Sequence, residues 1–469
     1  MKRIKRVYKQ TISIVDETAV SIYENLSRGQ MGFLMESYDK NNGRYTFLGV
    51  NPKEVITSKG QSLVIKRQGE EEEVRKGNPL EQLKKYYSEF EIIKEEGELA
   101  FTGGFVGNLG YDFFRYSEVL PDDNPEEIGI ETIQLMLADE FIVIDHVAET
   151  LSAVVLGEDS SKGEEESLEI AKALIKTARQ STTVDTELWK PEGRMIKKSD
   201  TLDQYVEKVN KIKEYIKEGD IFQTVLSQRW TIETEQSGFD LYKRLRELNP
   251  SPYLYYFKYE DFEVIGSSPE MLVKYKEQKV YTCPIAGTRR RGKDPAEDLL
   301  IQKDLLEDEK EKAEHVMLVD LARNDMGRIS EFGTVKVTRF MEVENYSHVM
   351  HLVSLVEGKK KDEYHPLDLL ASFLPAGTLS GAPKIRAMEI IDELETSRRG
   401  LYGGATGYID FNGELDFCIT IRTMMKKENK VYLQAGAGIV ADSDPESEYE
   451  ECCNKVMALA RTLIQEEKL

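Results

Sequence analysis

The amino-acid sequence predicts a mixed α/β protein, and three observations along its 469 residues support that class. Residues 1–155 contain short runs rich in β-branched and aromatic residues, separated by Gly, Asn and Asp, which is typical of strands and turns. Residues 201–219 repeat apolar side chains at helical spacing, between a capping box and a glycine. Strand-like and helical patterns then alternate to the end of the chain.

The same patterns divide the chain into three regions. We expect strands and turns over residues 1–156, a connecting segment over 157–200, and a C-terminal region over 201–469 that carries most of the distinctive motifs. The connecting segment opens on a Gly/Ser-rich stretch and ends on a polar one. The individual elements expected are strands at 62–65, 141–144, 222–226, 253–257, 271–275, 334–339, 405–411 and 417–424, and helices at 201–219, 297–322, 383–394 and after Pro445.

Charge and cysteine content exclude several classes of protein. The chain carries 63 basic and 85 acidic residues, for a net charge of −22, whereas a nucleic-acid-binding protein needs a basic surface. Its four cysteines include no Cys-x-x-Cys spacing, which argues against a zinc cluster or a disulfide framework. We find no signal peptide and no apolar run of about 20 residues. We therefore expect a soluble cytoplasmic protein that binds neither nucleic acid nor membrane.

Two pairs of glutamates are candidates for a metal site. Glu311 and Glu314 are spaced i, i+3 within the expected helix 297–322, so both carboxylates project from one face. Glu448 and Glu451 repeat that spacing on the last helix. Four carboxylates that converge from two helices suit a hard cation such as Mg²⁺. The alternative is that these are chance surface pairs, since the chain has 85 acidic residues.

Two glycine-rich loops and a histidine supply the remaining candidates. The backbone N–H groups of Gly436 and Gly438 could hold a carboxylate, and residues 378–384 enter a helix whose N-terminus attracts anions. Tight turns without a ligand are the alternative for both segments. His351 lies three residues after His348, and histidine is the usual proton-transfer group near neutral pH. A structural histidine is the alternative here.

In their order along the chain, these motifs resemble those of the chorismate-utilising enzymes. The resemblance covers residues 208–463, and so many ordered motifs leave little room for coincidence. It implies a large fold in which two sheets pack as a sandwich, with helices outside and the active site between the sheets. The matching stretches are 219–223, 268–270, 284–288, 314–325, 346–354, 375–384, 399–404 and 434–455.

The resemblance also implies roles for individual residues. Glu270 would protonate the departing 4-hydroxyl of chorismate, Thr378 would contact the substrate near the reacting ring, and His351 would transfer a proton while pyruvate is lost. A binding protein that had lost catalysis would have no physical need to keep Glu311, Glu314, Glu448, Glu451, Arg422, His351 and Lys455 together. The carboxylates that would hold Mg²⁺ belong to Glu311, Glu314, Glu448 and Glu451. The groups that would bind the substrate belong to Gln223, Tyr402, Arg422, Gly436, Ala437, Gly438 and Lys455.

Members of the family differ at three positions, and the residues of this chain at those positions indicate which reaction it catalyses. Water-adding relatives carry a lysine base where this chain has Gln223, and an amide cannot deprotonate water. Some aminodeoxychorismate synthases carry a nucleophilic lysine where this chain has Ala286, although others have alanine there. The sequence Pro-Ala-Gly-Thr at residues 375–378 favours the anthranilate-forming enzymes over relatives that carry Pro-Gly-Gly. The resemblance therefore implies attack of ammonia at C2, then elimination of pyruvate to give anthranilate for tryptophan biosynthesis. The alternative is an aminodeoxychorismate synthase component I of folate biosynthesis, which does not release pyruvate.

The resemblance further implies one partner and one inhibitor. No Gly-x-Cys-x-Gly nucleophile loop of a glutamine amidotransferase occurs in the chain, so ammonia would come from a separate small subunit. Residues 35–37 and 43–49 resemble the feedback-inhibition segment of the family, and 249–254 resemble the opposite wall of that pocket. A plain turn near residue 36 is the alternative. The pocket expected for L-tryptophan is lined by Glu36, Ser37, Asn249, Pro252, Tyr253, Leu254 and Cys418.

Overall fold

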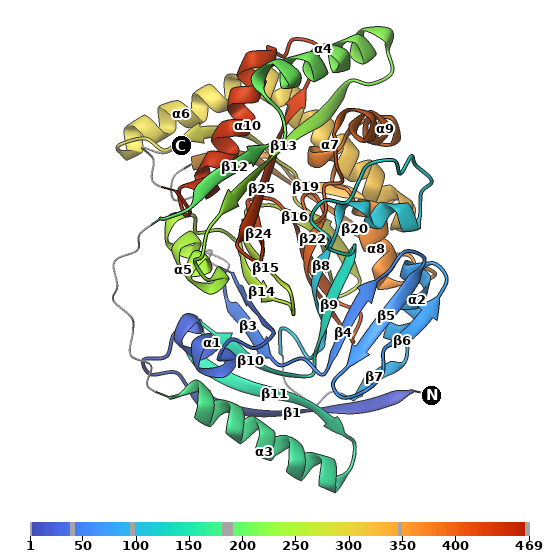
Figure 1. Cartoon of the computed structure of the whole chain (residues 1–469), viewed down its shortest axis with the longest axis vertical. Helices are drawn as coiled ribbons and strands as arrows, with labels where there is room; N and C mark the ends of the chain where they lie inside the picture. The colour runs from blue at the N-terminus through green and yellow to red at the C-terminus, as the bar shows by residue number, and fades with distance from the viewer. Residues whose placement is uncertain (1, 38–42, 94–98, 181–190, 346–348, 465–469) are drawn as a thin grey trace.

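The computed structural model describes residues 2–37, 43–93, 99–180, 191–345 and 349–464. In this part of the chain, two large sheets face each other and helices cover their outer sides (Figure 1). The prediction of a two-sheet sandwich flanked by helices is confirmed.

The first sheet runs in the order β12 (Arg194–Lys198), β13 (Gln223–Glu233), β25 (Lys430–Ile439), β24 (Thr423–Lys427), β15 (Phe262–Ser268), β14 (Tyr253–Lys258), β2 (Gly32–Glu36), β3 (Tyr45–Val50), β10 (Glu140–Asp145), β11 (Thr150–Glu158), β1 (Arg3–Ser13) and β7 (Phe90–Ile93), with β21 (Gly381–Ala382) beside β13. The second sheet runs in the order β18 (Ile285–Arg290), β20 (Val349–Lys359), β17 (Lys279–Thr282), β16 (Met271–Lys276), β23 (Leu415–Ile419), β22 (Ala405–Asp410), β8 (Gly104–Leu109), β9 (Ile133–Ala138), β4 (Glu54–Ser58), β5 (Ser62–Arg67) and β6 (Glu73–Lys76), with β19 (Lys336–Asn345) beside β20.

The helices are α1 (Ala19–Ser27), α2 (Pro79–Tyr87), α3 (Ser161–Ala178), α4 (Leu202–Glu218), α5 (Gly238–Leu248), α6 (Pro295–Glu307), α7 (Glu309–Ile329), α8 (Pro366–Phe373), α9 (Lys384–Leu394) and α10 (Pro445–Ala460), with the 3₁₀ turns η1 (Tyr111–Tyr116) and η2 (Gly377–Leu379). The capping box and the terminal glycine predicted for α4 are both present.

Two main apolar cores hold these layers together. One contains side chains from both sheets, among them Phe105 of β8 and Phe257 of β14, which are fully buried. The other lies on the outer face of the first sheet and includes Trp230 of β13 with Tyr242 of α5. Burial of each such side chain stabilises the fold by roughly 2–3 kcal/mol. The two sheets therefore form a rigid support for the segments that connect them.

Both sheets combine strands from the N-terminal and the C-terminal regions of the chain. β14 pairs with β2, where Leu254 lies opposite Glu36, and β22 pairs with β8, where Ala405 lies opposite Leu109. The boundary expected at residue 156 lies within β11. Residues that are distant in sequence are thus brought side by side in both layers.

The structure corrects several predicted elements. Residues 1–156 also contain α1 and α2, which the strand-and-turn prediction missed although Thr18 and Asn78 cap them. The helix predicted at 297–322 is two helices, α6 and α7, because Asp308 leaves the helical conformation and caps α7. The connecting segment contains the strand β12, which was not predicted, in addition to the helix α3, and its residues 181–190 lie outside the described residues.

The strand predicted at 417–424 is also two strands, and they lie in different sheets. β23 ends at Ile419 in the second sheet, and β24 begins at Thr423 in the first. Arg422, between them, has a φ of 49°, a left-handed conformation that costs a non-glycine residue of order 1 kcal/mol. The chain therefore crosses from one sheet to the other at this residue.

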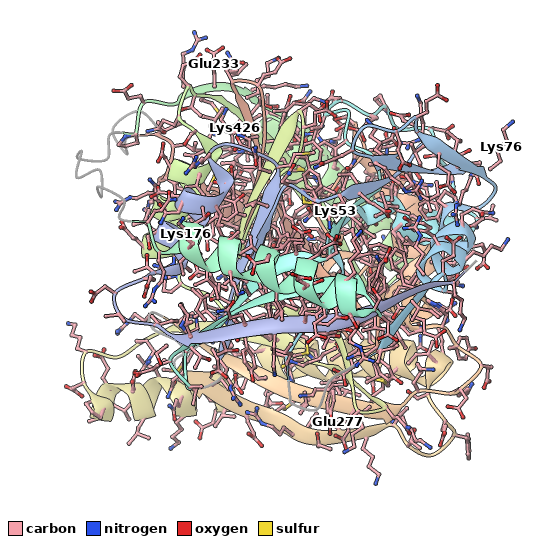
Figure 2. All side chains as sticks on the ribbon, turned by 90° about the horizontal axis from the view of Figure 1, so that it is seen from below. Lys53, Lys76, Lys176, Glu233, Glu277 and Lys426 are labelled. Atoms are coloured by element: carbon pink, nitrogen blue, oxygen red, sulfur yellow. The ribbon has the colours of Figure 1, made fainter. Side chains whose placement is uncertain are left out.

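Charged side chains cover the outside of the molecule (Figure 2). In that view Lys76 and Glu277 lie at the rim of the molecule and Lys53 near the middle of the picture, and Nζ of Lys53, which is also exposed, is 3.0 Å from Oδ2 of Asp139. None of the described helices combines the length and the apolar character that a bilayer span requires.

Candidate active site

Two neighbouring crossovers between the sheets form the centre of the candidate site. Pro269 and Glu270 lead from β15 in the first sheet to β16 in the second, and residues 420–422 lead back from β23 to β24. The crossovers are bonded to each other, since the Ile419 N–H donates to the Glu270 carbonyl at 3.0 Å and the Ser267 N–H donates to the Arg422 carbonyl at 3.1 Å. Glu270 and Arg422 are therefore positioned by backbone hydrogen bonds.

Glu270 is a buried acid whose pKa lies near neutrality. The residue is 9% exposed, and burial raises the pKa of its carboxyl to about 7. The Thr378 hydroxyl on η2 donates to its Oε1 at 3.1 Å, and this bond partly offsets the rise, as do the positive charges of Arg422 and Lys455. A carboxyl with this pKa can hold a proton at pH 7 and release it to a bound molecule.

Arg422 presents a guanidinium group that is open to a ligand. The residue is exposed, yet nearby protein atoms partly desolvate the guanidinium and lower its pKa from 12.5. Among the described residues it makes no side-chain hydrogen bond or ion pair, although Glu270 is close enough to favour its charge. A desolvated, unpaired arginine fork is suited to bind a carboxylate in bidentate fashion.

His351 lies on β20 as a buried, neutral imidazole. Burial lowers its pKa below the usual value, and the nearby Arg422 lowers it further. Its Nδ1 lies 3.1 Å from the Gly287 carbonyl and 3.1 Å from the Thr288 hydroxyl. Because the carbonyl can only accept, we infer that Nδ1 carries the proton and that Nε2 is the basic nitrogen. His348, the other histidine of the sequence motif, lies outside the described residues.

The glycine-rich segment predicted as a loop is part of β25, and this prediction was wrong. Gly436 lies opposite Ser227 of β13, and Gly438 lies opposite Val225. The Ser227 N–H donates to Glu395 and the Val225 N–H donates to the Ser380 carbonyl, so neither donates to β25. In an antiparallel ladder both glycine N–H groups must then point away from β13. The strand edge, instead of a loop, offers these two donors to a ligand.

The other clamp candidates gather at this edge. Lys455 of α10 donates to the Gly436 carbonyl at 3.0 Å and pairs with Glu451 at 2.6 Å. A Cβ at Gly436 would lie 3.0 Å from the Tyr402 hydroxyl. A Cβ at Gly438 would lie 2.3 Å from Nε2 of Gln223, so a larger residue there would displace this side chain, whereas Ala437 between the glycines is fully buried. The side-chain amide oxygen Oε1 of Gln223 is buried and has no hydrogen-bond partner in the described part of the chain.

The four glutamates of the proposed metal site lie on α7 and α10. Burial raises the pKa of Glu314, and the charges of Glu311 and Glu451 raise it further. Burial also raises the pKa of Glu448, again with a contribution from Glu451. Carboxylates from the two helices are therefore close enough to repel one another, and four carboxylate donors are the kind of ligand that Mg²⁺ prefers.

Two of these four carboxylates pair with basic side chains. Within the described ranges, no three acidic, histidine or cysteine side chains are gathered closely enough to hold a metal ion. Glu311 pairs with Arg289 at 3.0 Å, and Glu451 pairs with Lys455 at 2.6 Å. The donor set fits a divalent cation by its chemistry and its mutual repulsion, which a cation would relieve.

The residues expected to bind tryptophan lie on both faces of the first sheet and, for Cys418 of β23, in the second sheet. Leu254 belongs to the outer core beside α5, and Glu36 opposite it accepts from Arg246 of that helix at 2.8 and 3.1 Å and from Tyr242. Tyr253 and Cys418 belong to the core that contains both sheets. The remaining three residues are Asn249 at the end of α5, the half-buried Pro252 before β14, and Ser37 after β2.

Sequence reasoning missed several residues that contact these groups. Arg289 follows directly on the matched stretch 284–288, so its position was the signal available for it. Tyr242 and Arg246 are spaced i, i+4, which places them on one face of α5, but only the folded sheet brings Glu36 to that face.

Comparison with known proteins places the chain in a family. The family model for the chorismate binding enzymes matches residues 32–461. The chain is 46% identical to anthranilate synthase component 1 of Acetivibrio thermocellus, over 95% of this chain and 93% of that protein. It superposes with a TM-score of 0.81 on the crystal structure of anthranilate synthase component I from Streptococcus pneumoniae TIGR4, at 38% identity over 90% and 93% of the two chains.

A third likeness concerns the fold alone. The isochorismate synthase MenF of Escherichia coli gives a TM-score of 0.73 at 19% identity, over 98% of this chain and 95% of that chain. The chain belongs to the chorismate binding enzyme family, and the family resemblance seen in the sequence is confirmed. Within that family its relatives at 42–46% identity are anthranilate synthase component 1 proteins.

Proposed function

We propose that this chain is the chorismate-converting component of an anthranilate synthase, which turns chorismate and ammonia into anthranilate, pyruvate and water. The proposal rests on one observation: the buried acid Glu270 and the open guanidinium of Arg422 lie on two crossovers that are joined by backbone hydrogen bonds. The identity to anthranilate synthase component 1 proteins over nearly the whole chain supports this reaction over that of an aminodeoxychorismate synthase.

The first step is amination of the ring. Ammonia forms a bond to C2, the ring double bonds shift, and the bond from C4 to its hydroxyl breaks. Hydroxide is a poor leaving group, so the proton held by Glu270 passes to that oxygen and water departs. The Thr378 hydroxyl orients the carboxyl by its hydrogen bond to Oε1.

The second step is elimination. The ring carbon that carries the new amino group loses a proton, the bond from C3 to the enolpyruvyl oxygen breaks, and pyruvate leaves after taking up a proton on its methylene carbon. Neutral His351 is suited to receive the ring proton because its lowered pKa keeps Nε2 unprotonated at pH 7. Aromatisation of the ring drives this step.

The remaining groups bind the substrate. Arg422, the Tyr402 hydroxyl, Lys455 and the N–H groups of Gly436 and Gly438 are the donors for its carboxylates. The carboxylates that would hold Mg²⁺ are those of Glu311, Glu314, Glu448 and Glu451. Bound there, the cation would supply positive charge for the ring carboxylate of chorismate.

Ammonia would come from a partner. The relatives are named as a component 1, which implies a second component, and we propose that a glutamine amidotransferase small subunit fills that role.

We also propose that L-tryptophan inhibits the enzyme by binding where β2 and β14 pair, at Glu36 and Leu254. Ser37→Ala should weaken inhibition by tryptophan while the rate without tryptophan is unchanged, and equal inhibition of both proteins would remove this site from the proposal.

Product analysis tests the main proposal. The purified chain is incubated with chorismate, Mg²⁺ and a high concentration of ammonium, and anthranilate fluorescence and pyruvate are measured together. We expect equal amounts of the two products. An aminated, non-aromatic product without pyruvate would overturn the proposal and assign the chain to folate biosynthesis.

A further inference from the structure

A buried ion pair lies beside the candidate site and takes no part in the steps above. The Arg399 side chain is 1% exposed and that of Glu395 is 7% exposed. Arg399 donates from Nε and one terminal nitrogen to both carboxylate oxygens of Glu395, at 2.9 and 2.7 Å. The desolvation cost of such a pair is often as large as its Coulomb attraction, so stability alone is a weak explanation for it.

The further side-chain hydrogen bonds of the pair go to one edge of β13 and to η2. Arg399 donates to the carbonyl of Val225 at 2.8 Å and to that of Leu379 at 2.6 Å. Glu395 accepts from the N–H and the hydroxyl of Ser227, at 2.9 and 2.7 Å. On this edge β13 pairs with β21 at one end and with β12 at the other, and Val225 and Ser227 lie between the two pairings. The ion pair therefore forms the backbone hydrogen bonds that a neighbouring strand would otherwise form there.

Each of these contacts leads to a group of the candidate site. Leu379 follows Thr378, which donates to Glu270. Val225 and Ser227 lie opposite Gly438 and Gly436, whose N–H groups face the substrate region. In addition, the Arg399 guanidinium carbon lies 5.5 Å from the ring centre of Tyr402, whose hydroxyl lies near Gly436.

We propose that Arg399, oriented by Glu395, is a positioning residue that fixes the Thr378–Glu270 pair relative to the carboxylate clamp of Tyr402, Gly436 and Gly438. The inference rests on the proposed function. One guanidinium joins three segments that are distant in sequence, and a misplacement of about 1 Å between catalytic groups can cost about a hundredfold in rate. Only arginine has the planar fork that reaches several acceptors at once.

Arg399→Lys is the direct test. Lysine keeps a positive charge for Glu395 but cannot reach Val225 and Leu379 together, so the fold survives while η2 shifts. We expect kcat/KM for chorismate to fall about 10- to 100-fold. We also expect the alkaline limb of its pH profile to rise by about 0.5–1 unit, since the Thr378 bond that lowers the Glu270 pKa is weakened. Thr378→Val removes that bond directly and shows the size of the shift.

Two further variants make the result decisive. Arg67→Lys removes a similar fork, since Arg67 donates to Glu54 at 3.1 Å at the far edge of the second sheet. It should lower Tm and leave the pH profile unchanged. If Arg399→Lys does not fold, the isosteric variant Glu395→Gln is used to test the inference. We expect it to shift the alkaline limb of the pH profile in the same direction, by a smaller amount. A folded variant of the pair whose pH limb and kcat/KM match the wild type overturns the inference. A wild-type chain that does not convert chorismate overturns the proposed function instead.

Discussion

The crossovers and the acidic helix faces are two halves of one candidate site, and they differ in how completely the protein alone assembles them. At the crossovers, Glu270 and Arg422 are held by backbone hydrogen bonds, and Thr378 contacts the Glu270 carboxyl directly. On α7 and α10, the carboxylates repel one another, and Glu311 and Glu451 each pair with a basic side chain.

The difference follows from charge. Glu270 and Arg422 do not repel each other, since the carboxyl is either negative or neutral beside a positive guanidinium, so the crossover groups can be close without a ligand. Four carboxylates cannot converge without a counter-charge, because their repulsion in a partly desolvated place amounts to several kcal/mol. The half proposed for proton transfer is therefore preorganised, whereas the half proposed for the cation would be completed by what binds there.

The largest effect is expected from Glu270→Gln at the preorganised half. An amide cannot donate the proton, so kcat should fall by about 10²–10⁴, measured as anthranilate fluorescence. The same change should stabilise the fold at alkaline pH. The native pKa is raised to about 7, so stability from this carboxyl is complete below about pH 4.5 and is lost as the pH rises through 7, by up to about 3 kcal/mol. Thermal melts at pH 5 and 8.5 check this, and equal Tm differences at both would contradict a raised pKa.

His351→Gln should act on the second step alone. Glutamine can keep a bond to the Gly287 carbonyl, but it has no basic nitrogen to accept the ring proton. Pyruvate release should slow by about 10²-fold while chorismate is still consumed, so an aminated, non-aromatic intermediate should accumulate. Rapid quenching followed by chromatography measures it. Equal slowing of chorismate consumption and pyruvate release would place His351 outside the second step.

Glu314→Gln probes the cation half. Removal of one of the four carboxylates should weaken Mg²⁺ binding about tenfold or more, since ligand charge sets the affinity for hard cations. The rise of Tm with added Mg²⁺ measures this without reference to activity. Glu309→Gln is the matched control, because Glu309 lies on the same helix and pairs outward with Lys312. Identical Mg²⁺ responses of the two variants would argue against a metal site on α7.

The smallest effect is expected from Arg289→Gln. This change removes the 3.0 Å ion pair between Arg289 and Glu311. The Glu311 carboxylate then does not have to give up an arginine partner when it binds a cation. Mg²⁺ should bind about 2- to 5-fold tighter, the size expected for a partly exposed ion pair. The same Tm titration reports it, and weaker binding would mean that Arg289 holds Glu311 in place for the cation.

Local patterns in the sequence were enough to predict much of the fold. The cap and stop residues of α4 and the run of apolar residues in β14 depend only on neighbours along the chain, and both elements formed as expected. The breaks at Asp308 and Arg422 were missed because each depends on where the chain must go next, and periodicity carries no information about that. The glycines of β25 were misjudged for a related reason, since their strand conformation depends on pairing with β13, which is distant in sequence.

The sequence by itself determined the layered α/β class, the family, and the residues proposed for the site, because these follow from residue types and their order. Only the tertiary structure decided that Glu270 and Arg422 lie on adjacent crossovers, that the clamp is a strand edge, and that Arg399 joins both to η2. Burial, hydrogen-bond partners and the pKa of a carboxyl are set by atoms that come together only in the folded chain. For that reason no local pattern around Glu270 predicts a pKa near 7.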